Sequence, residues 1–352
     1  MLPIPTLRLA AQQLTTTTLA SPAEMVAHLG AVQAQDVNMA KWAIGLRLPN
    51  CNLATVTEAC NRGEILRTHV LRPTWHFVAP ADIRWMLSLS KDRIKAQFQV
   101  RDSDLGLDDK IYTKSNKVIT KALEGGRHLL REELAALLKK AKINADEGRI
   151  THIMMNAEIE GLVCSGAMRG KQQTYALLDE WVPPVKMPIK EEALACLALR
   201  YFTGHGPATP QDCVWWSGLT ATNIRQGLRL VCKQLTCEKI EGKEYWFSPS
   251  ISKGCTLDKT PSCFLLPAWD EYLVGYKDRS AVLHNDYQRT AIVVNGTFRP
   301  VVIYNGQVIG IWKKSTRKDE MVVAEYFKKP TKKQEQAVAA AAQKLGKFWR
   351  EA

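Results

Sequence analysis

Apolar residues near the middle of the chain recur at the spacing of an amphipathic helix. Between residues 129 and 141 they are Leu130, Leu134, Leu137 and Leu138, which fall at i, i+4, i+7 and i+8. Such residues lie on one face of a helix and need a partner to cover them. The pattern therefore predicts a helix that packs against its neighbours in the chain.

This helix belongs to a succession of three helices and two short strands. The helices are expected at 115–126, 129–141 and 149–162, and the two strands lie within 162–178. Three helices followed by a hairpin are the order of elements in a winged helix. We therefore predict a winged helix in the middle of the chain.

The same succession is predicted on both sides of the middle copy. The later copy follows a proline-rich joint at 181–188, and its strand pair within 235–248 turns at Gly242. Its helices are expected at 190–202, 209–219 and 220–232. The looser first copy comprises helices at 21–32, 38–48 and 53–63 and a hairpin within 65–78.

Beyond the third copy the pattern changes to strand-like alternation. Residues 263–314 alternate between apolar and polar, with turns at Asn295-Gly296 and Asn305-Gly306, which predicts a small β-barrel or sheet. An Ala/Lys-rich helix is expected at 331–350. The predicted fold class is α+β, with three tandem winged helices, then a small C-terminal β-barrel or sheet and a terminal helix. The predicted domains are winged helices at 1–102, 103–182 and 189–250, followed by the barrel-like domain with its helix at 260–352.

Charge points to an anionic partner. The 352 residues include 48 Lys and Arg against 35 Asp and Glu, a formal net charge of +13. Basic clusters such as those at 313–318 and 328–333 are often no more than solvated surface, but the chain as a whole also has an excess of basic residues. Nucleic acid is therefore the leading partner class.

Several other classes are disfavoured. No apolar run approaches 18 residues, and the N-terminal sequence lacks the pattern of a signal peptide, so we expect a cytoplasmic, nucleoid-associated protein. Nine cysteines without a C-x-x-C pair favour reduced thiols over a zinc site. Phosphate-binding glycine loops and dinucleotide fingerprints are missing. We expect neither a metal nor a cofactor.

Two glutamines, Gln33 and Gln35, stand two residues apart after a helix marked by Met25 and Leu29. Residues at i and i+2 share a face only in an extended segment, so the glutamines can act together only if the helix ends near residue 33. Asp36 and Asn38 favour helix caps and make such an end plausible. The alternative is a frayed helix end with two exposed amides.

The Q-aliphatic-Q element and the segments at 71–80, 201–219 and 265–279 together resemble the winged-helix, AlkZ/YcaQ-like family of bacterial DNA glycosylases. The resemblance covers nearly the whole chain. It implies a DNA glycosylase that excises bulky alkylpurines and unhooks interstrand crosslinks, with Gln33 and Gln35 as catalytic residues. One branch of the family carries aspartate at the position of Gln35, and this sequence follows the two-glutamine branch.

The chemistry of two neutral amides suits a base that is already cationic. A purine alkylated at N7 or N3 leaves without a general acid. Amide oxygens can then stabilise an oxocarbenium-like sugar and orient a water at C1′. Asp36 is a second candidate for the general base, ranked lower because in an extended segment it faces away from both glutamines.

Other candidates are less specific. The residues expected to contact DNA are Arg149 and His152 on the third helix of the middle copy, Arg169, Lys171 and Gln173 on its wing, and His69 and His76 in the first hairpin. The alternatives are solvated surface residues and structural histidines. The segment 270–279 offers Asp270, Glu271, Asp278 and Arg279, either as a catalytic carboxylate site or, preferred here, as an Asp–Arg brace.

The sequence thus predicts a monofunctional, metal-free DNA glycosylase that acts as a monomer on duplex DNA carrying alkylated bases. The alternative is a non-catalytic winged-helix DNA-binding protein or transcription regulator. A dimeric regulator needs an apolar dimerisation helix, and residues 332–349 are only a modest candidate.

Overall fold

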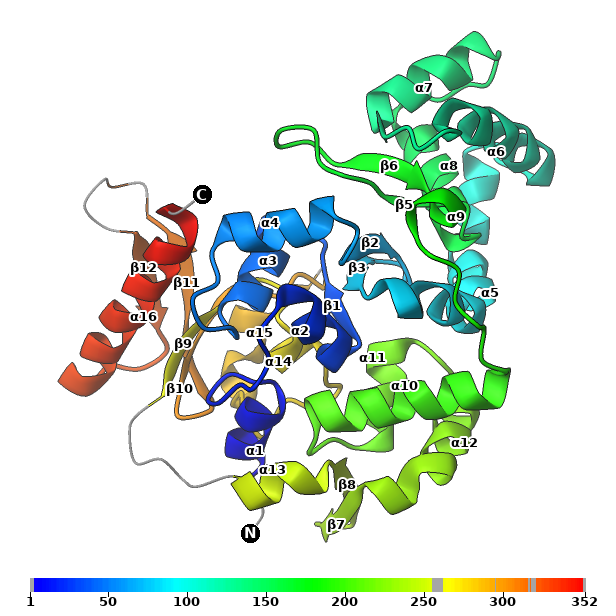
Figure 1. The fold of residues 1–352 in the computed structure, drawn as a ribbon. Helices are drawn as coiled ribbons and strands as arrows, with labels where there is room; N and C mark the ends of the chain where they lie inside the picture. The colour runs from blue at the N-terminus through cyan, green and yellow to red at the C-terminus, as the bar shows by residue number, and fades with distance from the viewer. Residues whose placement is uncertain (1–2, 255–261, 295, 316, 318–320, 351–352) are drawn as a thin grey trace. The chain divides into compact units, whose positions relative to one another are not determined.

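The computed structural model describes residues 3–254, 262–294, 296–315, 317 and 321–350 (Figure 1). The chain divides into two compact units. Unit 1 combines residues 1–57 with 194–352, and unit 2 comprises 58–193. Unit 1 is therefore built from two separate stretches of chain.

The first stretch of unit 1 is mainly helical. Its elements are α1 (Ile4–Ala11), α2 (Pro22–Leu29), β1 (Ala31–Gln33), α3 (Val37–Gly45) and α4 (Leu53–Asn61), the last of which runs into unit 2. Helix α2 starts at a capping box, in which Ser21 accepts from the Glu24 N–H and Glu24 accepts from the Ser21 N–H. It ends at Gly30, whose φ of 78° favours glycine.

The second stretch of unit 1 begins with helices and continues with strands. The helical part contains α10 (Lys190–His205, whose first turn belongs to unit 2), α11 (Pro210–Ser217), α12 (Ala221–Val231) and the short η1 (Cys232–Gln234). The hairpin β7 (Thr236–Ile240) and β8 (Lys243–Phe247) follows, with Cys237 opposite Trp246. The remaining elements are α13 (Pro249–Gly254), β9 (Cys263–Leu266), α14 (Glu271–Val274), η2 (Asn285–Tyr287), α15 (Gln288–Ala291), β10 (Val301–Tyr304), β11 (Gln307–Lys314), β12 (Val322–Tyr326) and α16 (Lys332–Arg350).

The C-terminal strands form an antiparallel sheet in the order β12-β11-β10-β9. Asn305 and Gly306, with φ of 49° and 78°, make the tight turn between β10 and β11, as the sequence predicts. In the part of the chain that the structure describes, these strands make an open sheet and not a closed barrel, so of the two predicted forms the sheet is correct. Asn295 of the other predicted turn lies outside the described residues.

Helix α16 lies beside this sheet and packs against β9 and α3 (Figure 1). The rings of Trp42 on α3 and Phe348 on α16 are 5.1 Å apart, and Gly45 leaves space for Phe348. The predicted helix at 331–350 is thus confirmed, and its apolar face is covered within the chain.

Unit 2 contains a hairpin, a long helix and a compact group of helices and strands. Its elements are β2 (Leu66–His69), β3 (Trp75–Val78), α5 (Pro80–Asp104), α6 (Asp109–Leu123), β4 (Leu129–Leu130), α7 (Arg131–Lys140), α8 (Glu147–Ile159), β5 (Val163–Ser165), β6 (Thr174–Leu177) and α9 (Leu178–Trp181). Strands β4, β6 and β5 form one sheet in that order. Leu134 and Leu138 lie in the core of this group, whereas Leu137 is 37% exposed, so the apolar face of α7 is narrower than predicted.

Most expected helices and strands occur within a few residues of their predicted places. The apolar pattern does not predict α1 or α5. Within the segment 263–314, where only strands are predicted, residues 271–274 and 288–291 form the short helices α14 and α15. The four predicted domains are a finer division than the two compact units, whose first boundary falls inside the predicted first domain; they stay a prediction. No helix among the described residues combines the length and apolar character needed to cross a membrane.

Candidate active site

The predicted glutamine pair lies at the end of a short strand in unit 1. Helix α2 ends at Leu29, three residues before the end of the predicted helix at 21–32, and Gln33 is the last residue of β1. Gln33 is 6% exposed, whereas Gln35 lies in the bend that follows and is exposed. The chain is therefore not a frayed helix at this point, and the two side chains have different surroundings.

The backbone of Gln33 is anchored from the far end of the sequence. Its N–H donates to Oε1 of Glu271 over 2.9 Å, across 238 positions of chain. Glu271 is fully buried at the start of α14. One member of the predicted glutamine pair is thus held by one member of the predicted 270–279 cluster.

Asp36 begins helix α3. Its Oδ1 accepts from the N–H groups of Asn38 at 2.9 Å and Met39 at 3.1 Å, as an N-terminal cap does. These hydrogen bonds give Asp36 a structural role as a helix cap, which makes it a weaker candidate for the general base.

Asp270 forms a buried brace with Arg47. The guanidinium of Arg47 donates to both carboxylate oxygens, each at 2.8 Å, and both side chains are almost fully buried. Arg47 also donates to the backbone and side-chain oxygens of Gln12. The preferred Asp–Arg brace therefore exists, but its arginine lies just after α3 rather than in the cluster itself.

The other two members of the cluster have separate partners. Asp278 pairs with Lys243 at 2.9 Å, and this contact, together with the Ser280 hydroxyl, holds the pKa of Asp278 below its ordinary value. Arg279 donates to the carbonyl of Leu273 and lies over the Phe298 ring.

Residues predicted to contact DNA from α8 are engaged within unit 2. Arg149 donates to the carbonyls of Leu105, Asn144 and Gly106, so it ties down the loop before α6. Nδ1 of His152 lies 2.5 Å from Oδ1 of Asp102. A direct role of either side chain in DNA binding stays a prediction.

The predicted wing is more open. Arg169 is exposed although it pairs with Glu133 at 2.8 Å, and Lys171 is exposed at the tip between β5 and β6. Gln173 is half-buried. Lys171 is thus the wing residue best placed for solvent-side contacts, and its part in DNA binding stays a prediction.

The two hairpin histidines are buried. His69 is paired through Nδ1 with Glu158, which also accepts its backbone N–H, and its ring lies 4.3 Å from that of Trp75. His76 is bonded to the Thr74 carbonyl at 2.9 Å, and burial lowers the pKa of its imidazole well below the ordinary value. These surroundings favour the structural alternative, and contact with DNA stays untested.

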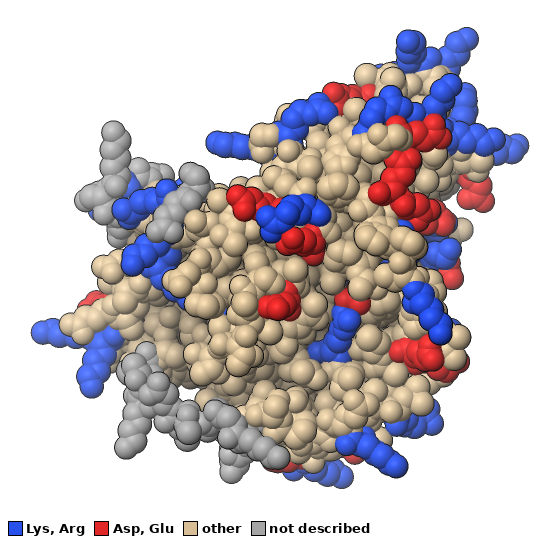
Figure 2. All heavy atoms as spheres, viewed as in Figure 1, with Lys and Arg blue, Asp and Glu red and all other residues tan. Residues whose placement is uncertain are grey.

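Sequence reasoning missed a row of lysines on α6. Lys110, Lys114, Lys117 and Lys121 are all exposed, and their spacing of 4, 3 and 4 residues puts them on one face of the helix. Figure 2 shows basic side chains gathered over the α6 and α7 end of unit 2. We call these four residues the α6 lysine row. A helical-wheel reading of 109–123 would have found them.

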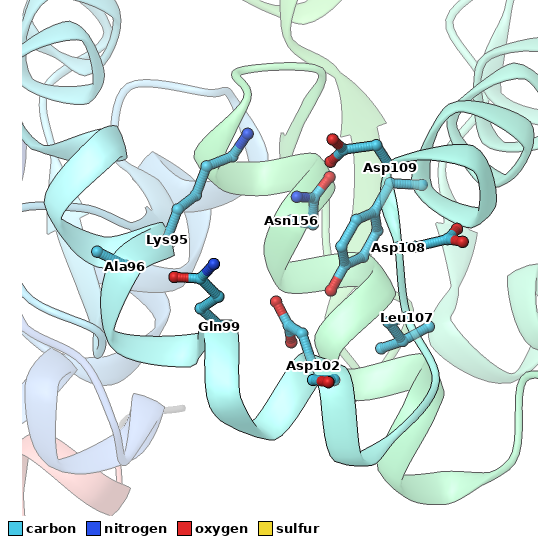
Figure 3. Close-up of a pocket in the computed structure, with 10 residues that line it drawn as sticks. Lys95, Ala96, Gln99, Asp102, Leu107, Asp108, Asp109 and Asn156 are labelled. Carbon is cyan, nitrogen blue, oxygen red and sulfur yellow. The ribbon is translucent and has the colours of Figure 1, made fainter.

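An acidic hollow lies elsewhere on unit 2 (Figure 3). It has a volume of about 310 Å³ between α5, α6 and α8, and its lining includes Asp102, Asp108 and Asp109. Its carboxylates repel phosphate, so this hollow does not suit the DNA backbone. Among the described residues, no three His, Cys, Asp or Glu side chains are grouped as metal ligands.

Comparison with known proteins defines the class of this protein as a DNA glycosylase. The chain belongs to the DNA glycosylase AlkZ-like family, whose sequence profile matches residues 26–348. A relative from Streptomyces sahachiroi, an interstrand DNA cross-link repair glycosylase, is 23% identical over 333 residues, which are 87% of this chain and 85% of the relative. The solved structure of Streptomyces sahachiroi DNA glycosylase AlkZ shares the fold, with a TM-score of 0.81 at 22% identity, over 98% of this chain and 95% of that one.

Proposed function

We propose that this DNA glycosylase hydrolyses the N-glycosidic bond of purines alkylated at N7 or N3, with Gln33 and Gln35 as catalytic residues. The alkyl group makes the base cationic, so the C1′–N bond breaks with the electron pair leaving on a neutral base. Water adds to C1′ and loses a proton to solvent. This chemistry needs no general acid.

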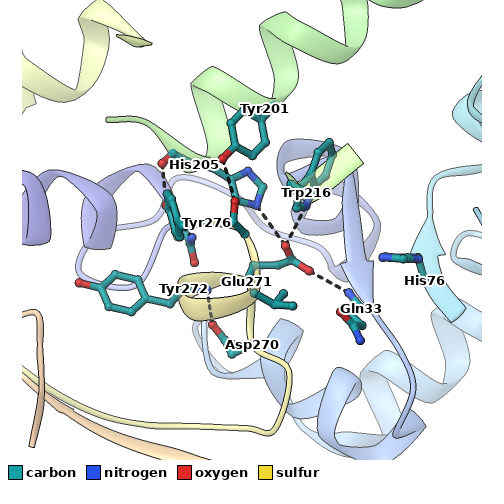
Figure 4. A network of polar contacts seen from close by, with 12 residues as sticks. Gln33, His76, Tyr201, His205, Trp216, Asp270, Glu271, Tyr272 and Tyr276 are labelled. Carbon is teal, nitrogen blue, oxygen red and sulfur yellow. Dashed lines mark hydrogen bonds and ion pairs between the residues drawn. The ribbon is translucent and has the colours of Figure 1, made fainter. Parts of the chain in front are cut away.

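Amide oxygens can supply what this reaction still needs, which is stabilisation of the sugar cation and orientation of the attacking water. Their lone pairs can face the positive charge that develops on the sugar and can accept a hydrogen bond from the attacking water. The observation that carries the proposal is that Glu271 anchors Gln33 (Figure 4), two residues before the exposed Gln35. A preorganised group costs no reorganisation at the moment of reaction.

We further propose that its substrates include interstrand crosslinks formed through alkylated purines. The relative from Streptomyces sahachiroi carries crosslink repair in its name. A crosslinked purine bonded at N7 is cationic in the same way as a methylated one. Uracil and 8-oxoguanine are uncharged and lie outside the proposed substrate class.

The proposed binding architecture is three winged helices in tandem, with the protein acting as a monomer on duplex DNA in the nucleoid. The succession α6-β4-α7-α8-β5-β6, with its sheet in the order β4-β6-β5, supports the middle copy. Helices α10, α11 and α12 followed by the β7–β8 hairpin support the third. The exposed α6 lysine row provides charge for phosphate contacts. Family membership favours this enzyme over a non-catalytic regulator.

The test is release of N7-methylguanine from duplex DNA under single-turnover conditions, with alkali cleavage revealing abasic sites. Gln33→Ala and Gln35→Ala should each slow release about 10²-fold, the usual scale for losing one preorganised group. Gln336→Ala, an exposed amide on α16, is the matched control and should keep the unmodified rate. Unmodified rates in both active-site variants, or efficient release of uracil, would refute the proposal.

A further inference from the structure

Helix α8 in unit 2 occupies the place of the third helix in the middle copy. In a helix-turn-helix protein, the corresponding helix enters a DNA groove and needs an open side to do so. In α8, however, every residue from 150 to 159 is buried or half-buried. Met155 and Ile159 pack in one cluster with Ile94 of α5, separate from the core of the middle copy. Helix α8 is therefore covered within unit 2 by the helix that precedes the copy.

Polar contacts hold α8 against the same neighbour. Nδ1 of His152 lies 2.5 Å from Oδ1 of Asp102 on α5, and the rings of His152 and Phe98 meet edge-on at 5.5 Å. Arg149 donates to the carbonyl of Leu105, directly after α5. The basic and imidazole side chains of α8 are thus engaged with α5 and with the loop that follows it.

Helix α12 in unit 1, the third helix of the third copy, has the opposite character. Three residues, including Gly218 with φ of 68°, join it to α11, as in a helix-turn-helix motif. An added Cβ at Gly227 would lie 2.3 Å from the carbonyl oxygen of Leu194, so this side of α12 lies tightly against α10. The buried residues of α12 are Ile224, Gly227, Leu228 and Val231. One side of the helix is therefore fixed, and its other side is exposed.

The exposed side of α12 is basic. Thr222, Arg225 and Arg229 are exposed, and their spacing of 3 and 4 residues puts them on one face of the helix. Lys233 is exposed in η1, directly after α12. The sequence from 221 to 234 contains no Asp or Glu. This segment therefore offers three cations to phosphate oxygens, and no carboxylate of its own opposes them.

The two hairpins show the reverse distribution of charge. The exposed charged residues of the β7–β8 hairpin are three carboxylates and two lysines, namely Glu238, Glu241, Glu244, Lys239 and Lys243. The wing of the middle copy, residues 166–173 between β5 and β6, contains no Asp or Glu. Its Arg169 and Lys171 are exposed, and Arg169 also pairs with Glu133. Because carboxylates repel phosphate, the wing of the middle copy suits DNA better than the hairpin of the third.

We infer that the two winged helices contact duplex DNA through opposite halves of the motif: the third copy through α12, and the middle copy through its wing. The inference rests on the proposed binding architecture and names the surface by which each copy binds. Arg225 and Arg229 contact phosphates that border a groove, since a guanidinium can donate two parallel N–H groups to a phosphate. Helix α8 stays packed within unit 2 and reads no groove.

A matched pair of substitutions compares the two helices. Thr222 and Gly148 are both exposed, and each is the second residue of its helix, where a glutamate favours the helical state. An added Cβ at Gly148 meets Leu105 at an ordinary distance of 3.5 Å. At about 100 mM salt, Thr222→Glu should weaken binding to undamaged duplex about 10-fold or more, because it places a negative charge opposite phosphate. Gly148→Glu should stay within about 3-fold of the unmodified affinity. Equal losses in the two variants overturn the inference.

Removal of cations compares the halves of the third copy. Arg225→Gln combined with Arg229→Gln should lower affinity about 10-fold or more, and should make the dependence of log K on log salt shallower by about 0.9 for each lost contact. The matched control, Lys239→Gln combined with Lys243→Gln, removes the same charge from the β7–β8 hairpin and should stay within about 3-fold. An unchanged salt slope in the arginine variant, or equal effects of the two variants, overturns the inference.

The same comparison applies to the middle copy. Arg169→Gln combined with Lys171→Gln should also make the salt slope shallower. Its control, Lys139→Gln combined with Lys140→Gln, removes two exposed lysines at the end of α7 and should change the slope less. Equal slopes in these two variants would show that the wing is not the contact surface.

Thermal unfolding shows which variants fold, and fluorescence anisotropy measures their binding to undamaged duplex. If the double arginine variant fails to fold, Thr222→Glu decides for α12. Binding to undamaged duplex breaks no glycosidic bond, so these variants test the contact surfaces separately from the proposed chemistry. Unmodified base release in Gln33→Ala and Gln35→Ala would refute the proposed function, whereas unmodified binding in the α12 variants would refute this inference, and the two failures are distinguishable.

Discussion

The two glutamines of the proposed site differ in what holds them. Gln33 is buried and fixed through its backbone, whereas Gln35 is exposed and followed by a helix cap at Asp36. The anchored Gln33 and the accessible Gln35 therefore suit different roles. Gln33 fixes the position of the pair, and Gln35 faces the solvent. The i, i+2 spacing indicated the pair, but no local pattern indicated Glu271 as its anchor.

Gln35→Asp should retain at least part of the base-release activity. The substituted carboxylate keeps an acceptor oxygen for the attacking water and adds a charge that favours the cationic sugar. The measurement is single-turnover release of N7-methylguanine, compared with Gln35→Ala and Gln35→Glu. Activity no higher in Gln35→Asp than in Gln35→Ala would mean that an acceptor is not what this position supplies.

Asp36→Ala separates a cap from a catalytic base. Loss of an N-cap should lower the free energy of unfolding by about 1 kcal/mol while base release changes little. Asp36→Ser, which restores a capping oxygen but no carboxylate, should recover most of that stability. Denaturant unfolding and single-turnover kinetics report the two quantities. A protein of normal stability that no longer releases base would instead identify Asp36 as the general base.

At the scale of elements, the sequence predicts those helices and hairpins that have a local signal, either an apolar periodicity or a turn motif. The β7–β8 hairpin around Gly242 and the β10–β11 turn at Asn305-Gly306 occur where expected, because their turn residues adopt positive φ. Helix α5 was missed because its second half lies open to solvent, with Val100 76% exposed, so no apolar face marks it. The early end of α2 depends on Gly30, whose positive φ ends the helix before the predicted position.

The α6 lysine row should contribute phosphate contacts. Replacing Lys110, Lys114, Lys117 and Lys121 by Ala should weaken binding to undamaged duplex at low salt. It should also make the dependence of log K on log salt shallower by about 0.9 for each phosphate that the variant no longer neutralises. Fluorescence anisotropy at 50–200 mM salt measures both effects.

The control for this helix replaces Lys186 and Lys190, exposed lysines outside α6. It should leave the salt slope near that of the unmodified protein. An unchanged slope in the fourfold α6 variant would show that the row is only solvated surface.

At the scale of the whole molecule, the proposed catalytic site combines parts of the sequence that lie far apart. Residues 1–57 supply the two glutamines and Arg47, and residues 194–352 supply Glu271, which holds Gln33, and Asp270, which pairs with Arg47. The family resemblance could be identified from motifs spread over the chain, whereas these buried contacts could not. Contacts across more than 200 positions carry no periodic signal, and the reach of Arg47 to Asp270 is set only by packing.

Acid should destabilise the folded chain between pH 7.5 and 5.5. Burial lowers the pKa of His28 and His76 below the ordinary 6.5, so below that pH the unfolded chain binds protons that the folded chain does not. The free energy of unfolding therefore falls as pH falls. Urea unfolding across this range measures the slope.

His28→Gln provides a control, because Gln can still donate to the Ala11 carbonyl that His28 contacts at 2.7 Å. This variant should lose less stability on acidification than the unmodified protein. A steeper loss, or greater stability of the unmodified protein at pH 5.5 than at 7.5, would contradict the assignment of His28 as a buried neutral ring.

The division of unit 1 between the two ends of the chain sets the order in which the ribosome can complete the site. Gln33 is made early, but Glu271 follows 238 residues later, which at about 5–20 residues per second is a delay of roughly 12–48 s. During that time residues 58–193 emerge in full and can fold first, while the glutamine strand waits without its anchor. A nascent or prematurely terminated chain can therefore carry a finished unit 2 while the proposed catalytic site is still unassembled.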